Sequence, residues 1–547
     1  MKNVGELKKI GKADFDKPTF PRPPSDTEKY SYVNPSSWGL SLTSLFLLVA
    51  FGVGSYLFVL NDPRLLSLYA VFAVIASLGM LWNAYLYLIV KKLDVDWRDR
   101  KRVWFLKESS YCPTVDVYLP SAGEDLDLLD SCYYYVSCLE YSNYKVWVLD
   151  DSGRPEVQKL ASRYGFEYIC RPEPRELKKS GNLRYAFPRT EGELILVLDA
   201  DMCPRPDMLD EMVWEFGKYP TLGLLQTPHY FRVERGQSRV ATGASLMQEL
   251  FFRVAQPAWN IFGAAICCGS NALYRREGLL ANGGPARIER SEDVATSLVI
   301  IKAGYKVKYL PLCLAAGLSP ETLRSFVNQL SRWSGGAYQT RTSSFLWNKY
   351  IPIHIKLIYC SSVVYFLTAA LGVVGFGFPG VINLLFFPEN IWFSNYFFIL
   401  PAVFLSILAK KQWSSLHWDL SILYAAFIIG YISLISTYDF LRGDLAGWVP
   451  TNQPRAKGES YSRFISCMRW IPAIGLTLCL AGIFKNWMVI EPWAWAPALL
   501  FWLGKFWVSR MVLIQDEEEE SIDKIYRHIE AYTHETNVKT HYASLKD

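Results

Sequence analysis

The stretch Glu193-Leu-Ile-Leu-Val-Leu-Asp-Ala-Asp201 carries a run of apolar residues that ends in two carboxylates. A short apolar run bounded by turn residues predicts a buried β-strand. Similar runs occur at Val115–Leu119, Lys145–Leu149 and Val307–Leu310, with helix-sized segments between them. Strands that alternate with helices predict an α/β domain with a mainly parallel sheet. In such sheets ligands bind at the carboxyl ends of the strands, where the two carboxylates of the first stretch lie.

Two pairs of acidic residues follow strands of this predicted sheet. Asp199 and Asp201 flank a single residue, so in an extended turn both carboxylates can reach one Mg²⁺ or Mn²⁺ ion. The alternative is an ordinary turn, because Asp is favoured there for local hydrogen bonds. The same alternative holds for Asp150-Asp151, whose second carboxylate can also accept hydrogen bonds from a base or a ribose.

Two further signatures come later in the chain. Ser291-Glu292-Asp293 begins a predicted helix, either as an N-cap with acidic first-turn residues or with Asp293 as the general base for an acceptor hydroxyl. Gln329-Leu-Ser-Arg332-Trp333 has helical spacing. Its Arg332 can pair with a diphosphate, and its Trp333 offers a flat apolar face to a sugar ring. The alternative is an amphipathic interfacial helix with an aromatic anchor, and both interpretations can hold together.

The composition indicates a membrane protein with a large polar domain. Of the 547 residues, 51% are apolar and only 20% are charged, and the long apolar runs are confined to the two ends. The net charge of +5 comes from 57 basic and 52 acidic residues without a basic block, which gives no support for nucleic acid as a partner. The 11 cysteines include no paired Cys-x-x-Cys motifs of the zinc-binding type.

Apolar runs of about 20 residues predict membrane-spanning helices, since a hydrocarbon core is ~30 Å thick. These runs are Trp38–Leu60, Leu65–Val90, Leu357–Phe376, Trp392–Ala409, Phe464–Phe484 and Trp493–Ile514. A further run, Leu420–Ser436, has basic residues on both sides, so we expect a helix along the cytosolic interface rather than a crossing. The expected count is six spans with both termini cytosolic, and seven is the alternative.

The basic residues between Lys91 and Arg102 follow the second span, which by the positive-inside rule places the next segment in the cytosol. Residues 1–37 are polar and rich in proline, so we expect a flexible cytosolic tail without a cleavable signal peptide. The acidic run Asp516–Glu520 opens a second polar tail, to which we assign no chemistry.

The four signatures, in this order and between membrane helices, resemble those of the processive family 2 glycosyltransferases, specifically the cellulose synthase superfamily. The similarity runs from about Val115 to Gly336. Further stretches that share it are Asp150–Val157, Arg171-Pro172, Lys179–Asn182, Gln226–His229, Cys268–Asn271 and Gly317–Thr322. The resemblance implies a cytosolic α/β domain of the GT-A type, inserted between about six transmembrane helices and amphipathic interface helices.

The expected boundaries follow from this resemblance and from the apolar runs. They are a cytosolic tail at 1–37, two membrane helices at 38–90, the GT-A domain at 111–317, interface helices at 318–347, a channel region at 357–514 and an acidic cytosolic tail at 515–547. The channel region would include an interface helix and a gating loop at about 417–462.

The resemblance also implies roles for individual residues. Those that would contact the nucleotide and its diphosphate are Ser121, Glu124, Asp151, Lys179, Asp199, Gln329, Arg332, Thr451 and Arg455. Asp199 and Asp201 would hold Mg²⁺ or Mn²⁺, and Asp293, with Glu292 beside it, would deprotonate the acceptor hydroxyl. Those that would contact the acceptor sugar are Trp333, His229, Cys268, Gly269 and Ser270.

The implied reaction is an inverting transfer of glucose from UDP-glucose to a growing β-glucan, which leaves through the chain's own channel in the plasma (inner) membrane. The alternative is a chitin- or hyaluronan-like synthase that uses a UDP-N-acetylhexosamine. Accessory secretion subunits or a homo-oligomer would be compatible partners. Two rival hypotheses are a transferase that adds one sugar to a lipid carrier and a membrane scaffold or transporter with a degenerate domain; the intact acidic signatures disfavour the scaffold.

Several positions depart from the family's pattern. Ser152 stands where glycine is usual, and Ser180 replaces the alanine of Lys-Ala-Gly-Asn. In the predicted gating loop Thr451 is kept, but Gln453 replaces a lysine, so its phosphate contact would pass to Arg455 or Lys457. We expect no cyclic-dinucleotide-binding domain after the last span, which leaves the linkage of the product open.

Overall fold

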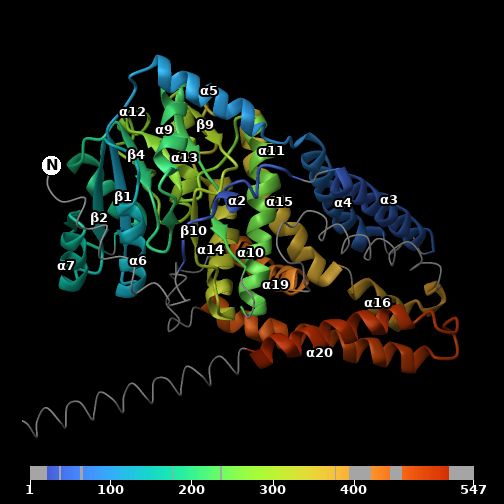
Figure 1. Cartoon of the computed structure of the whole chain (residues 1–547). Helices are drawn as coiled ribbons and strands as arrows, with labels where there is room; N and C mark the ends of the chain where they lie inside the picture. The colour runs from blue at the N-terminus through green and yellow to red at the C-terminus, as the bar shows by residue number, and fades with distance from the viewer. Residues whose placement is uncertain are drawn as a thin grey trace, which may run out of the picture.

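A seven-stranded mixed sheet forms the centre of the α/β domain in the computed structural model (Figure 1), which describes residues 21–35, 38–61, 66–174, 176–233, 237–375, 377–392, 421–443 and 459–515. The strand order is β3-β2-β1-β4-β8-β6-β9. The strands are β1 (Val115–Ser121), β2 (Tyr144–Asp150), β3 (Glu167–Cys170), β4 (Leu194–Val197), β6 (Leu222–Gln226), β8 (Ala272–Arg275) and β9 (Lys306–Tyr309). Only β8 runs antiparallel to its neighbours, so the predicted α/β fold with a mainly parallel sheet is confirmed.

Both faces of the sheet are apolar, because successive side chains of a strand point to opposite faces. In β4, Leu194 and Leu196 join one buried cluster, whereas Ile195 and Val197 join another. The helices of the first cluster are α6 (Leu126–Ser137), α7 (Pro155–Arg163) and α9 (Met208–Lys218). Those of the second include α8 (Lys178–Ala186), α12 (Glu277–Leu280) and α13 (Glu292–Lys302). Burial on both faces explains why these strands read as continuous apolar runs.

The parallel strands β1, β2 and β4 bring the acidic turns to one edge of the sheet. Ser121 pairs in register with Asp150 at the ends of β1 and β2, and the Asp199–Asp201 turn follows β4 on the other side of β1. A three-stranded sheet, β5-β10-β7, comes next to this turn, with β5 (Cys203–Pro204), β7 (Tyr230–Phe231) and β10 (Ala315–Gly317). The edge predicted to bind ligands is therefore the edge that carries both acidic pairs.

Long apolar helices extend to one side of this domain in Figure 1. They are α3 (Trp38–Asn61), α4 (Leu66–Ile89), α15 (Ile353–Gly375), α16 (Phe378–Phe386), α19 (Ser421–Arg442), α20 (Glu459–Asn486) and the segment Ala496–Gln515. Within the described ranges, five helices are long and apolar enough to cross a membrane: Trp38–Leu57, Ile353–Phe386, Ser421–Arg442, Ser460–Asn486 and Ala496–Gln515. The predicted span 392–409 lies outside the described residues after Trp392, so the count of six stays a prediction.

Helix α19 covers the run that we expected to lie along the interface. It packs against four helices: α15, α20, α10 (Arg239–Leu250) and α14 (Leu323–Thr342). Ile428, Tyr431 and Ile432 are almost fully buried. Of the most apolar stretch of α19, 67% is buried, a larger share than in the other four candidate spans of the described residues. An interfacial helix keeps one polar face in water, whereas α19 is surrounded by protein. Its length and composition suit a membrane span, and its position at the interface stays a prediction.

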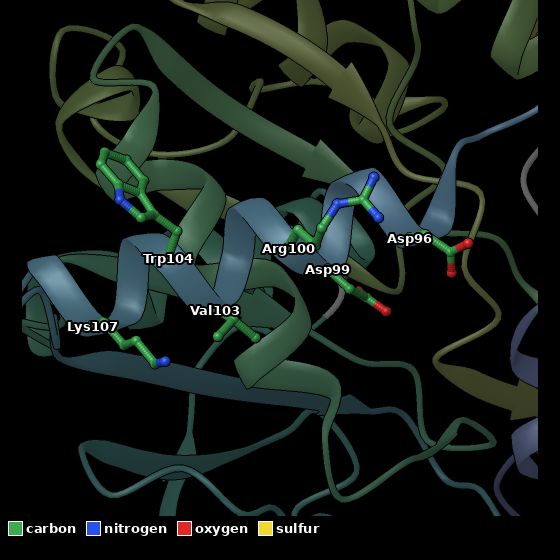
Figure 2. Close-up of a pocket in the computed structure, with 6 residues that line it drawn as sticks. All are labelled: Asp96, Asp99, Arg100, Val103, Trp104 and Lys107. Atoms are coloured by element: carbon green, nitrogen blue, oxygen red, sulfur yellow. The ribbon is translucent and has the colours of Figure 1, made fainter.

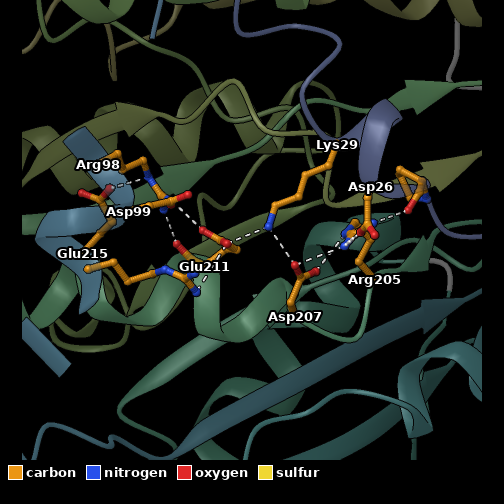
Figure 3. A network of polar contacts seen from close by, with 10 residues as sticks. Asp26, Lys29, Arg98, Asp99, Arg205, Asp207, Glu211 and Glu215 are labelled. Carbon is orange, nitrogen blue, oxygen red and sulfur yellow. Dashed lines mark hydrogen bonds and ion pairs between the residues drawn. The ribbon is translucent and has the colours of Figure 1, made fainter. Parts of the chain in front are cut away.

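The segment 22–35, here called the N-terminal strap, is docked on the α/β domain, whereas we expected a flexible tail over 1–37, of which residues 1–20 lie outside the described residues. Tyr32 is 1% exposed, and Glu28 forms an ion pair with Arg232 at 2.7 Å. Lys29 Nζ donates to Asp207 at 2.8 Å and to Glu211 at 2.7 Å (Figure 3). The polar composition therefore reflects ion pairs with the folded domain rather than solvation.

Candidate active site

Lys179 lies among the acidic signatures. Its ammonium contacts the carboxylate of Asp199 and donates to the carbonyl oxygen of Gly269 at 2.7 Å. Burial alone would lower the pKa of Lys179, but the negative charges of Asp199, Glu292 and Asp293 raise it above its ordinary value. The structure thus holds a charged lysine where the motifs from four separate parts of the sequence meet.

Gly269 lets two of these motifs approach each other. Its φ of +84° belongs to the left-handed region that favours glycine. A Cβ at this position would lie 3.1 Å from Oδ2 of Asp293 and 3.5 Å from Nζ of Lys179. The loop Cys268–Ser270, predicted to contact the acceptor, therefore runs directly beside the predicted general base.

Glu292 and Asp293 begin α13, as the sequence predicts, after Ser291 in a left-handed conformation with φ of 48°. Oδ1 of Asp293 accepts a hydrogen bond from the Val294 N–H at 2.7 Å. Burial raises the pKa of Asp293, and burial together with the Asp293 charge raises the pKa of Glu292 to about 7. Carboxylates with raised pKa values are stronger bases near neutral pH, which suits proton transfer from a hydroxyl.

Asp199 and Asp201 share the turn after β4. The Asp199 N–H donates to Ser270 Oγ at 2.8 Å, and the Leu318 N–H donates to Asp201 Oδ2 at 3.4 Å. Burial, with the neighbouring charge of Asp199, raises the pKa of Asp201 to about 7. Two close carboxylates that repel each other form a place where a cation is favoured.

The donor set fits a hard divalent ion that keeps ligands of its own. No group of three or more His, Cys, Asp or Glu residues that could hold a metal occurs within the described ranges. Mg²⁺ and Mn²⁺ are commonly bound by one or two carboxylates together with water and phosphate oxygens. Asp199 and Asp201 are therefore sufficient as the protein's share of such a site.

The end of β2 shows how the nucleotide motif is built. Asp150 is fully buried and accepts hydrogen bonds from Ser121 Oγ at 3.3 Å and Tyr168 Oη at 2.9 Å. In the loop after β1, Glu124 accepts the Ala122 N–H at 2.7 Å, and burial raises the pKa of Glu124. Ser121 thus helps to hold the Asp150 carboxylate, while the negative charge of Glu124 contributes to the raised pKa of Asp201.

Asp151, predicted to hold uridine, is bound by Arg171 in a bidentate pair. Nε reaches Oδ1 at 2.6 Å and Nη2 reaches Oδ2 at 2.7 Å. The same guanidinium donates to the carbonyls of Pro174, Glu176 and Lys178. A Cβ on Gly181 would lie 2.2 Å from Nη1 of Arg171, so the glycine of the Lys-Ser-Gly-Asn motif makes room for Arg171. Asp151 and Arg171 therefore fix the loop that carries Lys179.

Gln226 holds the Cys268–Ser270 loop in place, although the sequence motifs predicted no role for this residue. Its Nε2 donates to the Ser270 carbonyl at 2.7 Å, and its Oε1 accepts the Cys268 N–H at 2.8 Å. His229 Nε2 lies 3.0 Å from the same Ser270 carbonyl, and burial lowers the pKa of His229. The buried amide and imidazole thus fix the shape of the loop, and the signal for Gln226 was its place in the Gln-Thr-Pro-His stretch.

Helix α14 carries the Gln329, Arg332 and Trp333 signature, in agreement with the predicted helix. Burial lowers the pKa of Arg332, while Glu292, Asp199 and Asp293 act in the opposite direction through their charges. The Gln329 Oε1 atom is buried and has no hydrogen-bond partner among the residues that the structure describes, and Trp333 is 39% exposed. The structure therefore brings Arg332 to the acidic residues, whereas Thr451 and Arg455 lie outside the described residues.

A shallow groove elsewhere on the domain does not involve these residues. It has a volume of about 530 Å³ and follows the outer face of α5 (Val95–Glu108), as Figure 2 shows. Its lining side chains are Asp96, Asp99, Arg100, Val103, Trp104 and Lys107. The candidate site is instead defined by the contacts around Lys179.

Comparison with known sequences gives consistent matches. Residues 194–437 match the family described as Glycosyl transferase family group 2. The UDP-forming cellulose synthase catalytic subunit of Pseudomonas fluorescens is 33% identical over 290 residues, or 52% of this chain and 39% of its own length. Cellulose synthase 2 of Novacetimonas hansenii is 32% identical over 351 residues, or 61% of this chain and 22% of its own length. The chain thus spans well under half the length of these relatives.

Solved structures show only a weak likeness. A mannosyltransferase from Pyrobaculum calidifontis, in complex with GDP-Man and Mn²⁺, has 16% sequence identity and a TM-score of 0.42, and covers 67% of this chain and 99% of its own. Glucosyl-3-phosphoglycerate synthase from Mycobacterium tuberculosis has 17% identity and a TM-score of 0.28, and covers 38% of this chain and 72% of its own.

Proposed function

We propose that this chain is a family 2 processive glycosyltransferase of the cellulose synthase type, which transfers glucose from UDP-glucose to the end of a growing β-glucan. The name of a relative as a UDP-forming cellulose synthase supports a UDP-sugar donor. The five candidate spans of the described residues support a membrane location. In the proposed arrangement the α/β domain lies in the cytosol, and the polymer leaves through the channel region at 357–514. Apart from the docked N-terminal strap, the domain boundaries given in the sequence analysis are part of this proposal.

The observation that carries this proposal is the meeting of a cation site and a base. Lys179 contacts Asp199 and the Gly269 carbonyl, and Gly269 lies beside the Asp293 carboxylate. Arg332 lies close enough to interact electrostatically with the Asp199 and Asp293 carboxylates. Transfer from a nucleotide sugar needs positive charge at the leaving diphosphate and a base at the acceptor hydroxyl, side by side.

Asp293 takes the acceptor proton in the proposed reaction. Its carboxylate removes the hydroxyl proton as the oxygen attacks the anomeric carbon from the face opposite the diphosphate, so an α-linked donor gives a β-linkage. Arg332 and Gln329 hold the diphosphate, while Ser121, Glu124, Asp151 and Lys179 form the nucleotide end. The Cys268–Ser270 loop, His229 and Trp333 hold the acceptor sugar. Bound at Asp199 and Asp201, Mg²⁺ or Mn²⁺ supplies positive charge to the leaving diphosphate.

The test is the reaction of the purified full chain with single UDP-sugars and Mg²⁺ or Mn²⁺. We expect UDP release and a high-mass polymer from UDP-glucose, which linkage-specific glucanases digest. Asp293→Asn should lower the rate at least about a hundredfold because the base is lost. Asp127→Asn, on the exposed face of α6, is the control and should keep full activity.

Other products would overturn specific parts of the proposal. Turnover of UDP-N-acetylglucosamine without turnover of UDP-glucose would replace the donor with that of a chitin- or hyaluronan-like synthase. A short glycolipid in place of a polymer would contradict processivity. Full activity of Asp293→Asn would remove Asp293 as the base.

A further inference from the structure

We propose that the Lys179 ammonium neutralises the predicted metal carboxylates, Asp199 and Asp201, when no donor is bound. It moves away from them when the metal and the nucleotide bind together. The inference rests on the proposed function only for the nature of the ligands, a divalent ion and a nucleoside diphosphate. Its basis is the contact between the Lys179 ammonium and the Asp199 carboxylate, the first of the two predicted metal ligands.

The site needs a cation even before a metal binds. Asp199, Glu292 and Asp293 all act on Lys179 through their negative charges, and Asp201 lies close enough to Asp199 to be affected by its charge. The ammonium is also bonded to the Gly269 carbonyl at 2.7 Å, so it is held between the donor turn and the acceptor loop. Several partly buried carboxylates close together are unfavourable without a countercharge, and Lys179 supplies one from within the chain.

The backbone around Lys179 is fixed, whereas its side chain is long and can change direction. Leu177 and Lys178 have left-handed conformations with φ of 54° and 48°. Arg171 binds the Lys178 carbonyl at 2.9 Å, and Ser180 Oγ donates to the Ala286 carbonyl at 2.6 Å. Movement of Nζ away from Asp199 therefore requires only side-chain rotation, which the flexible four-carbon stem of lysine allows.

Lys179 and a divalent ion compete for the same carboxylate. An ammonium bonded to Asp199 occupies lone pairs that a metal would use, and two cations at one carboxylate repel each other. A diphosphate changes this balance, because its oxygens offer the ammonium another anionic partner. Metal binding should therefore be weak without the nucleotide and strong with it, and by linkage the metal should strengthen nucleotide binding by the same factor.

The experiment measures Mn²⁺ binding by electron paramagnetic resonance on the purified full chain, without and with UDP. For Lys179→Met we expect about tenfold tighter Mn²⁺ binding than in the unmodified protein when UDP is absent, because the competing charge is removed. The gain in Mn²⁺ affinity on adding UDP should shrink by a similar factor. Lys179→Arg keeps the charge and should bind Mn²⁺ weakly, as the unmodified protein does.

The controls separate this inference from the proposed donor and from misfolding. Lys159→Met, an exposed lysine of α7, should leave Mn²⁺ binding unchanged. Lys179→Gln, with its thermal unfolding measured, serves as the second neutral variant if Lys179→Met does not fold. If both neutral variants bind Mn²⁺ no more tightly than the unmodified protein without UDP, the inference is wrong. Because these titrations contain no sugar donor, a wrong assignment of the donor sugar would leave their outcome intact.

Discussion

The acidic residues of the site differ in the charges that surround them. Asp151 is paired with Arg171 and Asp199 with Lys179, so each of these carboxylates has a basic partner. Glu292 and Asp293 are neighbours at the start of α13 and are partly buried, and the charge of Asp293 opposes the ionisation of Glu292. Asp293, the proposed base, thus has different surroundings from Asp151 and Asp199, although all three are carboxylates.

This difference predicts how activity depends on pH. The base must be deprotonated, and burial raises the pKa values of the pair, to about 7 for Glu292. Activity should therefore be full at alkaline pH and fall as the pH drops through the raised pKa of Asp293. Glu292 and Asp293 titrate as an interacting pair, so Glu292→Gln removes one of the two ionisations and should move the acid limb of the kcat profile down by about half a pH unit or more.

The measurement is kcat at saturating donor over roughly pH 5 to 9, a range that brackets the acid limb. Glu156→Gln, at an exposed position of α7, is the matched control and should leave the profile unchanged. An acid limb that stays in place in Glu292→Gln would show that the two carboxylates are not coupled.

At the scale of elements, α14 and the loop before α13 meet through very close contacts. A Cβ on Gly336 would lie 1.9 Å from Ser291 Oγ and 3.2 Å from its Cβ. At the adjacent Gly335, a Cβ would lie 3.2 Å from Nη1 of Arg290. The two glycines therefore set the distance between the helix that carries Arg332 and the loop that leads to Asp293.

A double-mutant cycle tests this contact. Gly336→Ala should destabilise the protein by about 1–3 kcal/mol through overpacking and should lower kcat. Ser291→Gly removes the opposing Oγ and suits the φ of 48°, so the double variant should recover most of the loss. Thermal unfolding and kcat are measured for all four proteins.

A glycine in open surroundings provides the comparison. Within the described part of the chain, no atom outside its own helix lies within 4 Å of a Cβ on Gly504, so Gly504→Ala should not destabilise the protein or lower kcat. A double variant as impaired as Gly336→Ala alone would contradict the contact as the cause.

At the scale of the whole molecule, helix α9 contacts the two segments that flank the α3–α4 pair in the chain. The N-terminal strap precedes α3 and α5 follows α4 in the chain. Glu211 of α9 is 1% exposed and accepts from Lys29 of the strap at 2.7 Å and from Arg98 of α5 at 2.5 Å (Figure 3). These cations hold the pKa of Glu211 below its ordinary value, although burial acts against them. One buried carboxylate thus links two connections between the membrane helices and the catalytic domain.

Removal of that carboxylate should be costly. Glu211→Ala removes the carboxylate that Lys29 and Arg98 share, leaving Lys29 with Asp207 and Arg98 with its longer contact to Glu215, and should destabilise the protein by about 3 kcal/mol. Glu167→Ala breaks the exposed Lys145–Glu167 pair, whose side chains are each 53% exposed, and should cost at most about 1 kcal/mol. Thermal unfolding in detergent compares the two, and equal losses would contradict the role of α9.

The sequence by itself determined the features that depend on neighbouring residues. The strands at 115–119, 145–149, 193–198 and 307–310, the helical Gln329–Trp333 signature and the apolar helices all follow from local periodicity and composition. The acidic motifs could be named as candidates because the spacing of Asp199 and Asp201, and the place of Asp293 at a helix start, are properties of short segments.

Only the tertiary structure decided which groups are partners. Lys29 and Glu211 are 182 positions apart, and Lys179 and the Gly269 carbonyl are 90 apart, so no local pattern joins them. Polar residues in a proline-rich segment predict a solvated tail. In the N-terminal strap these residues instead form ion pairs with the α/β domain. Charge pairing acts through space rather than along the chain, which is why Lys179 at Asp199 emerged only when the strands and loops were assembled.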